Sequence, residues 1–188
     1  AASTLVDSDP DMNKLFRTNP NLNAINHDSL NSKKLRVINE DAFPLLDTNR
    51  EMFDFVVVDF PDPTNYSLGK LYTTAFYRLL AKHVSARGAI VVQSTSPLFA
   101  RQSYWCIVAT LKQTGLKTYP YHIYVPSFGE WGFVLGAGRE LGWPGQLRWG
   151  LNFYTLENFR SCFRFPNILL PRHVDPTGCT AHFWVGLY

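Results

Sequence analysis

Residues 53–63 read Phe-Asp-Phe-Val-Val-Val-Asp-Phe-Pro-Asp-Pro. The run Phe53–Val58 is short and rich in valine and phenylalanine, which predicts a buried β-strand. Two prolines prevent the strand from continuing, so a loop that carries Asp59 and Asp62 follows it. The stretch therefore predicts a strand of a parallel sheet whose carboxyl end presents two carboxylates.

The segments on both sides of this strand alternate between short apolar runs and helical spacing. Further strands are predicted at Thr4–Val6, Leu35–Ile38 and Gly88–Gln93, and helices at Asp9–Phe16, Leu71–Val84 and Pro97–Thr114. A terminal antiparallel hairpin is predicted from two β-rich stretches, Thr118–Val125 and Trp131–Gly136, joined by a turn. Strands separated by helices are typical of an α/β domain, so we expect a Rossmann-like, mostly parallel sheet.

Two parts of the chain differ in composition. Residues 1–138 carry the predicted sheet, and residues 139–188 form an aromatic, basic extension with one predicted helix, Thr155–Phe163. We expect the extension to pack on the sheet domain or on a partner chain. Because the chain opens with Ala1-Ala2-Ser3 and enters a predicted strand almost at once, we expect a fragment of a longer polypeptide.

Composition excludes several classes of protein. With 188 residues, 46% hydrophobic and 18% charged, the chain is neither disordered, collagenous nor a coiled coil. The formal net charge of +3 is not concentrated in a basic run, so no nucleic-acid partner is expected. No apolar run reaches the roughly 20 residues that span a bilayer. The three cysteines lie far apart in sequence with no Cys-x-x-Cys pair, so a disulfide framework is not expected. A reducing compartment fits better, and we expect a cytoplasmic location.

Acidic side chains follow three predicted strands. Asp7 follows the first, Glu40 and Asp41 the second, and Asp59 and Asp62 the third. Any single one of these acids is most simply a helix cap. Three in succession at one sheet edge predict an anionic site, whose ligand carries positive charge or several hydroxyl groups.

The order of the motifs resembles one enzyme family. Five motifs occur in the order found in polyamine aminopropyltransferases, that is, spermidine synthase and its relatives. They are Val-Asp-x-Asp-Pro, Asn-Glu-Asp-Ala-Phe, Val-Asp-x-x-Asp-Pro, Gln-Ser-x-Ser-Pro and the stretch Val125–Phe133. The resemblance runs from about Leu5 to Ala137. The stretch Asn65–Tyr72 resembles a bacterial branch in which a membrane-embedded region precedes this domain.

The resemblance implies a reaction and a role for each matching residue. The reaction is transfer of an aminopropyl group from decarboxylated S-adenosylmethionine to an amine such as putrescine. Asp59 is implied as the catalytic carboxylate. The implied amine site consists of Asp62, Tyr66 and Trp131, with Tyr72 beside them. The implied contacts to the adenosyl donor are Asp7, Asp41 and Gln93. The donor is a co-substrate, and no tightly bound cofactor or metal is implied. Apart from the resemblance, a homodimer is expected, because a second chain would cover an exposed sheet edge and the aromatic extension.

The chain also departs from the family. The family has a glycine-rich turn after its first, central strand, whereas the first glycine here is Gly69. We therefore expect that strand and turn to be missing, a gap or a neighbouring chain in their place, and little or no activity from residues 1–188 alone. Phe128 and Thr95 replace polar partners for an amine, which leaves the acceptor amine open.

Two alternatives remain open from the sequence. One is a non-catalytic domain that keeps the fold for binding or assembly, and the other is a methyltransferase that uses intact S-adenosylmethionine on the same scaffold. The stretch Gly136–Gly142 superficially resembles a dinucleotide-binding turn, but Trp143 and Pro144 block the helix that such a turn must open.

Overall fold

The computed structural model describes residues 2–63, 65–147 and 155–171. The chain divides into two compact units, residues 1–50 and residues 51–188. Each unit is described by itself.

The first unit contains one parallel pair of strands and short helices. Its elements are β1 (Ser3–Val6), α1 (Pro10–Thr18), α2 (Pro20–Ile25), the 3-10 turn η1 (Ser29–Asn31), β2 (Leu35–Ile38) and α3 (Ala42–Thr48). Strand β1 pairs with β2 from Ser3 opposite Leu35 to Val6 opposite Ile38. Two of the helices begin where an Asp-Pro or Asn-Pro pair supplies both a side-chain cap and the fixed φ of the first turn, at Asp9 and Asn19.

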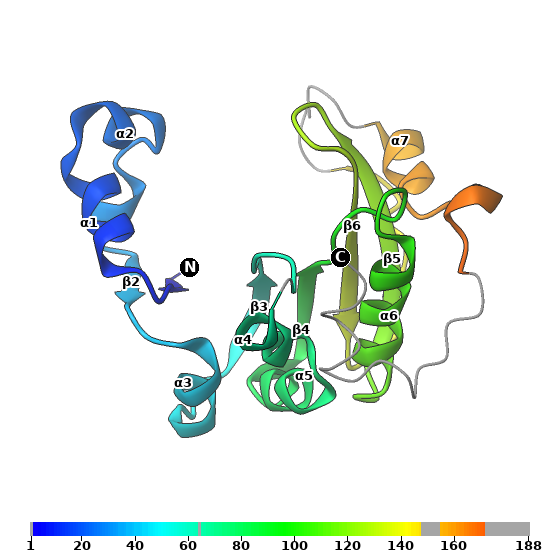
Figure 1. Ribbon diagram of the computed structural model, residues 1–188, viewed down its shortest axis with the longest axis horizontal. Coiled ribbons are helices and arrows are strands. Elements are labelled where there is room, and N and C mark those ends of the chain that lie inside the picture. The colour runs from blue at the N-terminus through cyan, green and yellow to red at the C-terminus, as the bar shows by residue number, and fades with distance from the viewer. Residues whose placement is uncertain (1, 64, 148–154, 172–188) are drawn as a thin grey trace. The chain divides into compact units, whose positions relative to one another are not determined.

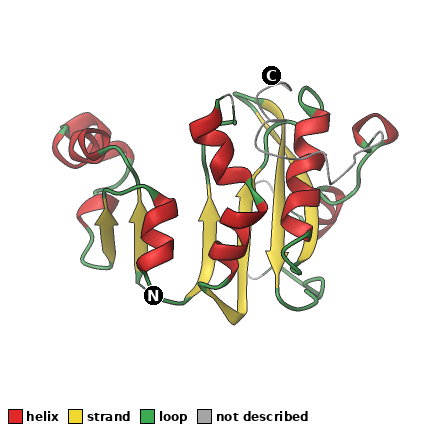
Figure 2. Ribbon diagram, turned by 60° about the horizontal axis from the view of Figure 1, so that its bottom comes forward, coloured by secondary structure: helices red, strands yellow, loops and turns green. Residues whose placement is uncertain are grey.

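The second unit contains a four-stranded sheet in the order β3-β4-β6-β5. Its elements are β3 (Phe53–Val58), α4 (Tyr66–Gly69), η2 (Lys70–Tyr72), α5 (Thr74–Ala81), β4 (Val84–Gln93), α6 (Arg101–Lys112), β5 (Lys117–Val125), β6 (Gly129–Ala137), α7 (Leu156–Ser161) and η3 (Asn167–Leu169). Strands β3 and β4 are parallel, whereas β6 runs antiparallel to both β4 and β5 (Figures 1 and 2).

The core of this unit lies between the sheet and the helices α5 and α6, which cover the same face of it (Figure 2). Fully buried side chains come from both layers: Phe76, Tyr77, Tyr104, Ile107 and Leu111 from the helices, and Ile90, Val92 and Val134 from the strands. The helix α6 approaches β6 closely because Gly132 and Gly136 present no side chain to it. Burial of these large apolar groups supplies the main stabilisation of the unit.

The described part of the C-terminal extension packs on the same unit. On one face of the sheet, the Phe163 ring lies 5.3 Å from the ring of Tyr121. On the face that carries α6, the Phe165 ring lies 5.8 Å from the ring of Tyr104. Residues 155–171 therefore cross the edge of the sheet at β5.

This crossing covers the outer edge of β5, which would otherwise leave its backbone groups unpaired. The backbone N–H of His122 donates to the carbonyl oxygen of Cys162 at 2.9 Å. The His122 ring also contacts Glu130 through Nδ1 and the carbonyl oxygen of Arg164 through Nε2, the latter at 2.9 Å. Pro120 fits this position because an edge strand tolerates a missing N–H.

The predicted α/β arrangement with a terminal antiparallel hairpin is confirmed, and the differences are local. Strands Leu35–Ile38 and Phe53–Val58 have the predicted bounds. The predicted helix Leu71–Val84 is shorter, because η2 precedes α5 and Val84 already belongs to β4. The helices α2 and α3 were not predicted.

Two strands keep one edge open. Among the described residues β1 pairs only with β2, and β3 pairs only with β4. Phe55 and Val57 of β3 are also 59% and 64% exposed, although their sequence is typical of a buried strand.

Two cysteines lie in the described part of the chain. Cys106 is buried in α6. Cys162 is free.

Candidate active site

The loop that follows β3 presents both of its aspartates at the carboxyl end of the strand. The hydroxyl of Tyr72 lies 3.1 Å from the carbonyl oxygens of both Phe60 and Pro61 and donates to them. Tyr72, which the sequence analysis placed beside the amine site, is only 1% exposed and holds the loop from inside. Asp59 is exposed, and Asp62 is half-buried.

One carboxylate oxygen of Asp62 accepts a hydrogen bond, and the other accepts none from the described residues. Thr95 Oγ1 donates to Asp62 Oδ2 at 3.1 Å. Asp62 Oδ1 is buried and has no hydrogen-bond partner among the described residues. A buried carboxylate oxygen without a donor is unfavourable, so this atom suits a ligand that donates a hydrogen bond.

The residue that holds Asp62 has an unusual backbone. Thr95 has a φ of +59°, in the left-handed region that β-branched residues rarely adopt. Two backbone hydrogen bonds fasten the segment to β6: Ser94 N–H donates to the Gly132 carbonyl at 2.9 Å, and Gly132 N–H donates to the Thr95 carbonyl at 2.7 Å. The contact between Thr95 and Asp62 was not predicted, because no local sequence pattern indicates a positive φ at threonine.

Gln93 ends β4, beside the end of β3. The parallel register pairs Val58 with Val92, which places Gln93 level with the start of the aspartate loop. Its side chain is 9% exposed, and Oε1 is buried with no hydrogen-bond partner among the described residues. The carboxyl ends of two neighbouring parallel strands therefore each carry a buried acceptor that lacks a donor.

The two aromatic residues predicted for the amine site differ in their surroundings. Trp131 is half-buried on β6, next to Gly132, and its ring lies 5.4 Å from that of Phe128. Tyr66 is 63% exposed as the first residue of α4. The structure thus brings Trp131 next to the Thr95 segment in the sheet and leaves Tyr66 open to solvent.

Asp7 and Asp41 lie in the first unit and act locally as caps. Asp7 Oδ1 accepts the backbone N–H of Asp9 at 2.8 Å, and Asp41 Oδ1 accepts that of Phe43 at 2.9 Å at the start of α3. The helix-cap interpretation therefore holds for one oxygen of Asp41. Asp59 and Asp62 belong to the second unit.

Burial keeps two core tyrosines protonated. Desolvation raises the pKa of Tyr77 well above its usual value, with a smaller contribution from Tyr72. Desolvation also raises the pKa of Tyr104, whose hydroxyl donates toward the carbonyl oxygens of Tyr121 and Phe133. Neither hydroxyl can serve as a base near neutral pH.

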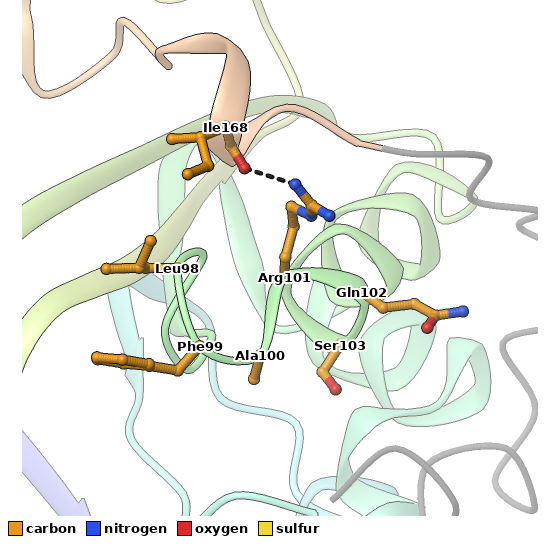
Figure 3. Close-up of a pocket in the computed structure, with 7 residues that line it drawn as sticks. All are labelled: Leu98, Phe99, Ala100, Arg101, Gln102, Ser103 and Ile168. Atoms are coloured by element: carbon orange, nitrogen blue, oxygen red, sulfur yellow. Dashed lines mark hydrogen bonds between the residues drawn. The ribbon is translucent and has the colours of Figure 1, made fainter.

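A cavity of about 460 Å³ lies at the start of α6 (Figure 3). It is lined by Leu98, Phe99, Ala100, Arg101, Gln102, Ser103 and Ile168. The Arg101 guanidinium donates to the Ile168 carbonyl at 2.6 Å (Figure 3), so its donors are partly used within the protein. No predicted site residue lines this cavity, and no group of metal-ligating side chains occurs in the described part of the chain.

Comparisons with known proteins agree with one another. The family model described as "Spermine/spermidine synthase domain" matches residues 1–141. Polyamine aminopropyltransferase 2 of Ralstonia nicotianae is 54% identical over 175 residues, which cover 92% of this chain and 34% of the relative. The polyamine aminopropyltransferase of Leptospira interrogans is 47% identical over 163 residues, or 87% of this chain and 33% of the relative. The chain thus spans about a third of the length of the curated relatives it matches.

Solved structures show the same fold. Spermidine synthase from Thermotoga maritima superimposes with a TM-score of 0.71 at 15% identity, covering 89% of this chain and 58% of that one. A spermidine synthase in complex with the transition state analogue AdoDATO gives a TM-score of 0.72 at 16% identity, with 89% and 59% covered. The Rossmann-like fold expected from the sequence is therefore confirmed.

Proposed function

Because the chain belongs to the spermine/spermidine synthase domain family, we propose that it is the aminopropyltransferase part of a polyamine synthase. Its reaction is transfer of an aminopropyl group from decarboxylated S-adenosylmethionine to an amine such as putrescine. The observation that carries this proposal is the aspartate loop after β3, which the Tyr72 hydroxyl holds and in which Asp62 Oδ1 is buried without a described donor. An ammonium group supplies such a donor and the opposite charge.

The chemistry assigns separate tasks to the two aspartates. A primary amine has a pKa of roughly 10, so it arrives protonated and cannot attack. Asp59, exposed at the end of β3, takes the proton, and the nitrogen lone pair then forms a bond to the aminopropyl carbon. The bond from that carbon to sulfur breaks, and its electron pair stays on sulfur, so methylthioadenosine leaves as a neutral thioether. Asp62 holds the second ammonium of the diamine, and alignment of nitrogen with carbon supplies much of the rate.

The donor site is proposed from the remaining predicted residues. Asp7 would accept hydrogen bonds from the ribose hydroxyls with the oxygen that Asp9 does not use, and Asp41 would accept the adenine amino group. Gln93 would contact the donor or the amine at the end of β4. Trp131 and Tyr66 would contact the methylene and ammonium groups of the amine. The donor is consumed in each turnover and acts as a co-substrate.

The test replaces Asp59 by asparagine in the longest natural chain that contains these residues. Loss of a positioned base lowers kcat by about two to four orders of magnitude, whereas donor binding stays nearly unchanged. The matched control is Asp54→Asn, because Asp54 is an exposed aspartate of the same strand that binds only Ser85 among the described side chains. Methylthioadenosine formation is measured for both variants. Equal activity of the two variants contradicts the role of Asp59, and use of intact S-adenosylmethionine by the wild type favours a methyltransferase.

Three wider proposals concern the whole protein. We propose that the chain is part of a longer polypeptide, which the one-third coverage of its relatives supports, and that a membrane region lies elsewhere in that polypeptide, as the Asn65–Tyr72 stretch suggests. Within the described residues no helix is long and apolar enough to cross a bilayer.

A homodimer is supported by the open edge of β3, since unpaired strand edges attract another strand, and the solution mass checks it. Cytoplasmic location stays a prediction.

A further inference from the structure

Thr95 combines burial with a backbone conformation that its side chain disfavours. It is 3% exposed, has a φ of +59°, and lies directly after β4 in the segment that faces the aspartate loop. The other non-glycine residues with positive φ, His27 and Asp28, are exposed in a turn of the first unit. A strained, buried, β-branched residue persists only where its surroundings impose the conformation.

The surroundings that impose it come from β6. Gly132 exchanges two backbone hydrogen bonds with the segment, accepting from Ser94 and donating to Thr95. A Cβ at Gly132 would lie 2.4 Å from the Tyr104 ring and 2.8 Å from the Thr95 carbonyl oxygen, so the strand and the segment meet without any spare space. The direction of the Thr95 hydroxyl is therefore set by the sheet and not by a flexible loop.

That hydroxyl meets Asp62, which is held from the other side. Tyr72 fixes the loop of Asp62 through the carbonyl oxygens of Phe60 and Pro61. Thr95 Oγ1 donates a hydrogen bond to Asp62 Oδ2 at 3.1 Å. Asp62 Oδ1 receives no hydrogen bond from the described residues. No ion pair joins Asp62 to a lysine or arginine of the described residues, so no described cation competes with a ligand for this carboxylate.

We propose that Thr95 is a positioning residue that selects a protonated primary amine: its neutral hydroxyl holds one oxygen of Asp62 and directs the other to the non-reacting ammonium of the substrate. This inference rests on the proposed function and deepens it, because it assigns recognition of the amine to a residue that never touches it. A neutral donor orients the carboxylate without cancelling its charge, whereas a cation in this place would compete with the substrate.

The test compares three replacements of Thr95 in the full-length protein. Thr95→Val keeps the size and branching but removes the hydroxyl, and we expect the KM for putrescine to rise about tenfold or more, with kcat and the KM for the donor little changed. Thr95→Ser restores the hydroxyl and should return the KM to within about threefold of the wild type. Thr95→Gly also lacks the hydroxyl but adopts positive φ freely, so it tests the same point should the valine variant fail to fold.

The matched control is Ser94→Ala, because the neighbouring buried hydroxyl donates to the Val92 carbonyl and not to Asp62. Thermal unfolding confirms that each variant is folded, and calorimetry with putrescine measures binding independently of turnover. An active wild type whose putrescine KM is unchanged by Thr95→Val, or raised equally by Ser94→Ala, overturns the role of Thr95 and leaves the proposed function standing. A wild type that forms no methylthioadenosine and binds no putrescine overturns both.

Discussion

Replacement of Gly132 by alanine tests how tightly the site is fixed to the sheet. Gly132 is buried in β6 and presents its Cα to helix α6. The added Cβ would lie 2.4 Å and 2.5 Å from two carbons of the Tyr104 ring and 2.8 Å from the carbonyl oxygen of Thr95. Tyr104 is fully buried, so its ring has no room to move away.

The cost follows from these distances. Overpacking of a filled core costs about 1–3 kcal/mol, and the upper end applies here because both the ring and the backbone must shift. Alanine also lowers the conformational entropy of the unfolded chain, which offsets about 0.4–1 kcal/mol of this loss of stability. We therefore expect a net loss of about 2–3 kcal/mol of unfolding free energy, or a Tm about 5–10 °C lower for a chain of this size.

Gly138→Ala is the matched control, because nothing lies within 4 Å of a Cβ at Gly138 and its φ is not positive. Thermal and urea unfolding are followed by circular dichroism for the wild type and both variants. If Gly132→Ala unfolds at the same temperature as Gly138→Ala, the close approach of α6 to β6 is wrong, and the fixed geometry of Thr95 loses its support. A lower Tm together with a raised putrescine KM links this packing to the amine site.

Two further predictions concern titrating groups outside the site. The pKa of Glu140 should lie below the 4.5 of an ordinary glutamate, because the Tyr119 hydroxyl and then the Lys117 ammonium stabilise the charged carboxylate. The charged Glu140 therefore slightly stabilises the fold above pH 4.5, and this contribution is lost as the pH falls through the lowered pKa. A carboxyl NMR titration checks this, and Tyr119→Phe should move the pKa back upward. Burial raises the pKa of the Cys162 thiol above 9.0, so its alkylation by iodoacetamide at mildly alkaline pH should be slower than that of a free cysteine, and an equal rate contradicts the burial.

Local sequence signals were enough for most of the secondary structure. The strand Phe53–Val58 was predicted with its observed bounds because valine and phenylalanine favour a strand and the following prolines end it. The start of α1 was predicted from Asp9, which caps the helix, and Pro10, which suits its first turn. Both residues act on their immediate neighbours in the chain. The helices α2 and α3 were missed because they are short and carry little apolar periodicity.

The sequence by itself determined the fold class, the family and the position of the aspartates at the end of β3, since each follows from short local motifs and from their order along the chain. Only the tertiary structure decided what surrounds those aspartates. The bond from Thr95 to Asp62 joins residues 33 positions apart, and the positive φ of Thr95 is imposed by Gly132 on another strand. Such contacts depend on strand register and on the packing of α6, which no local pattern encodes.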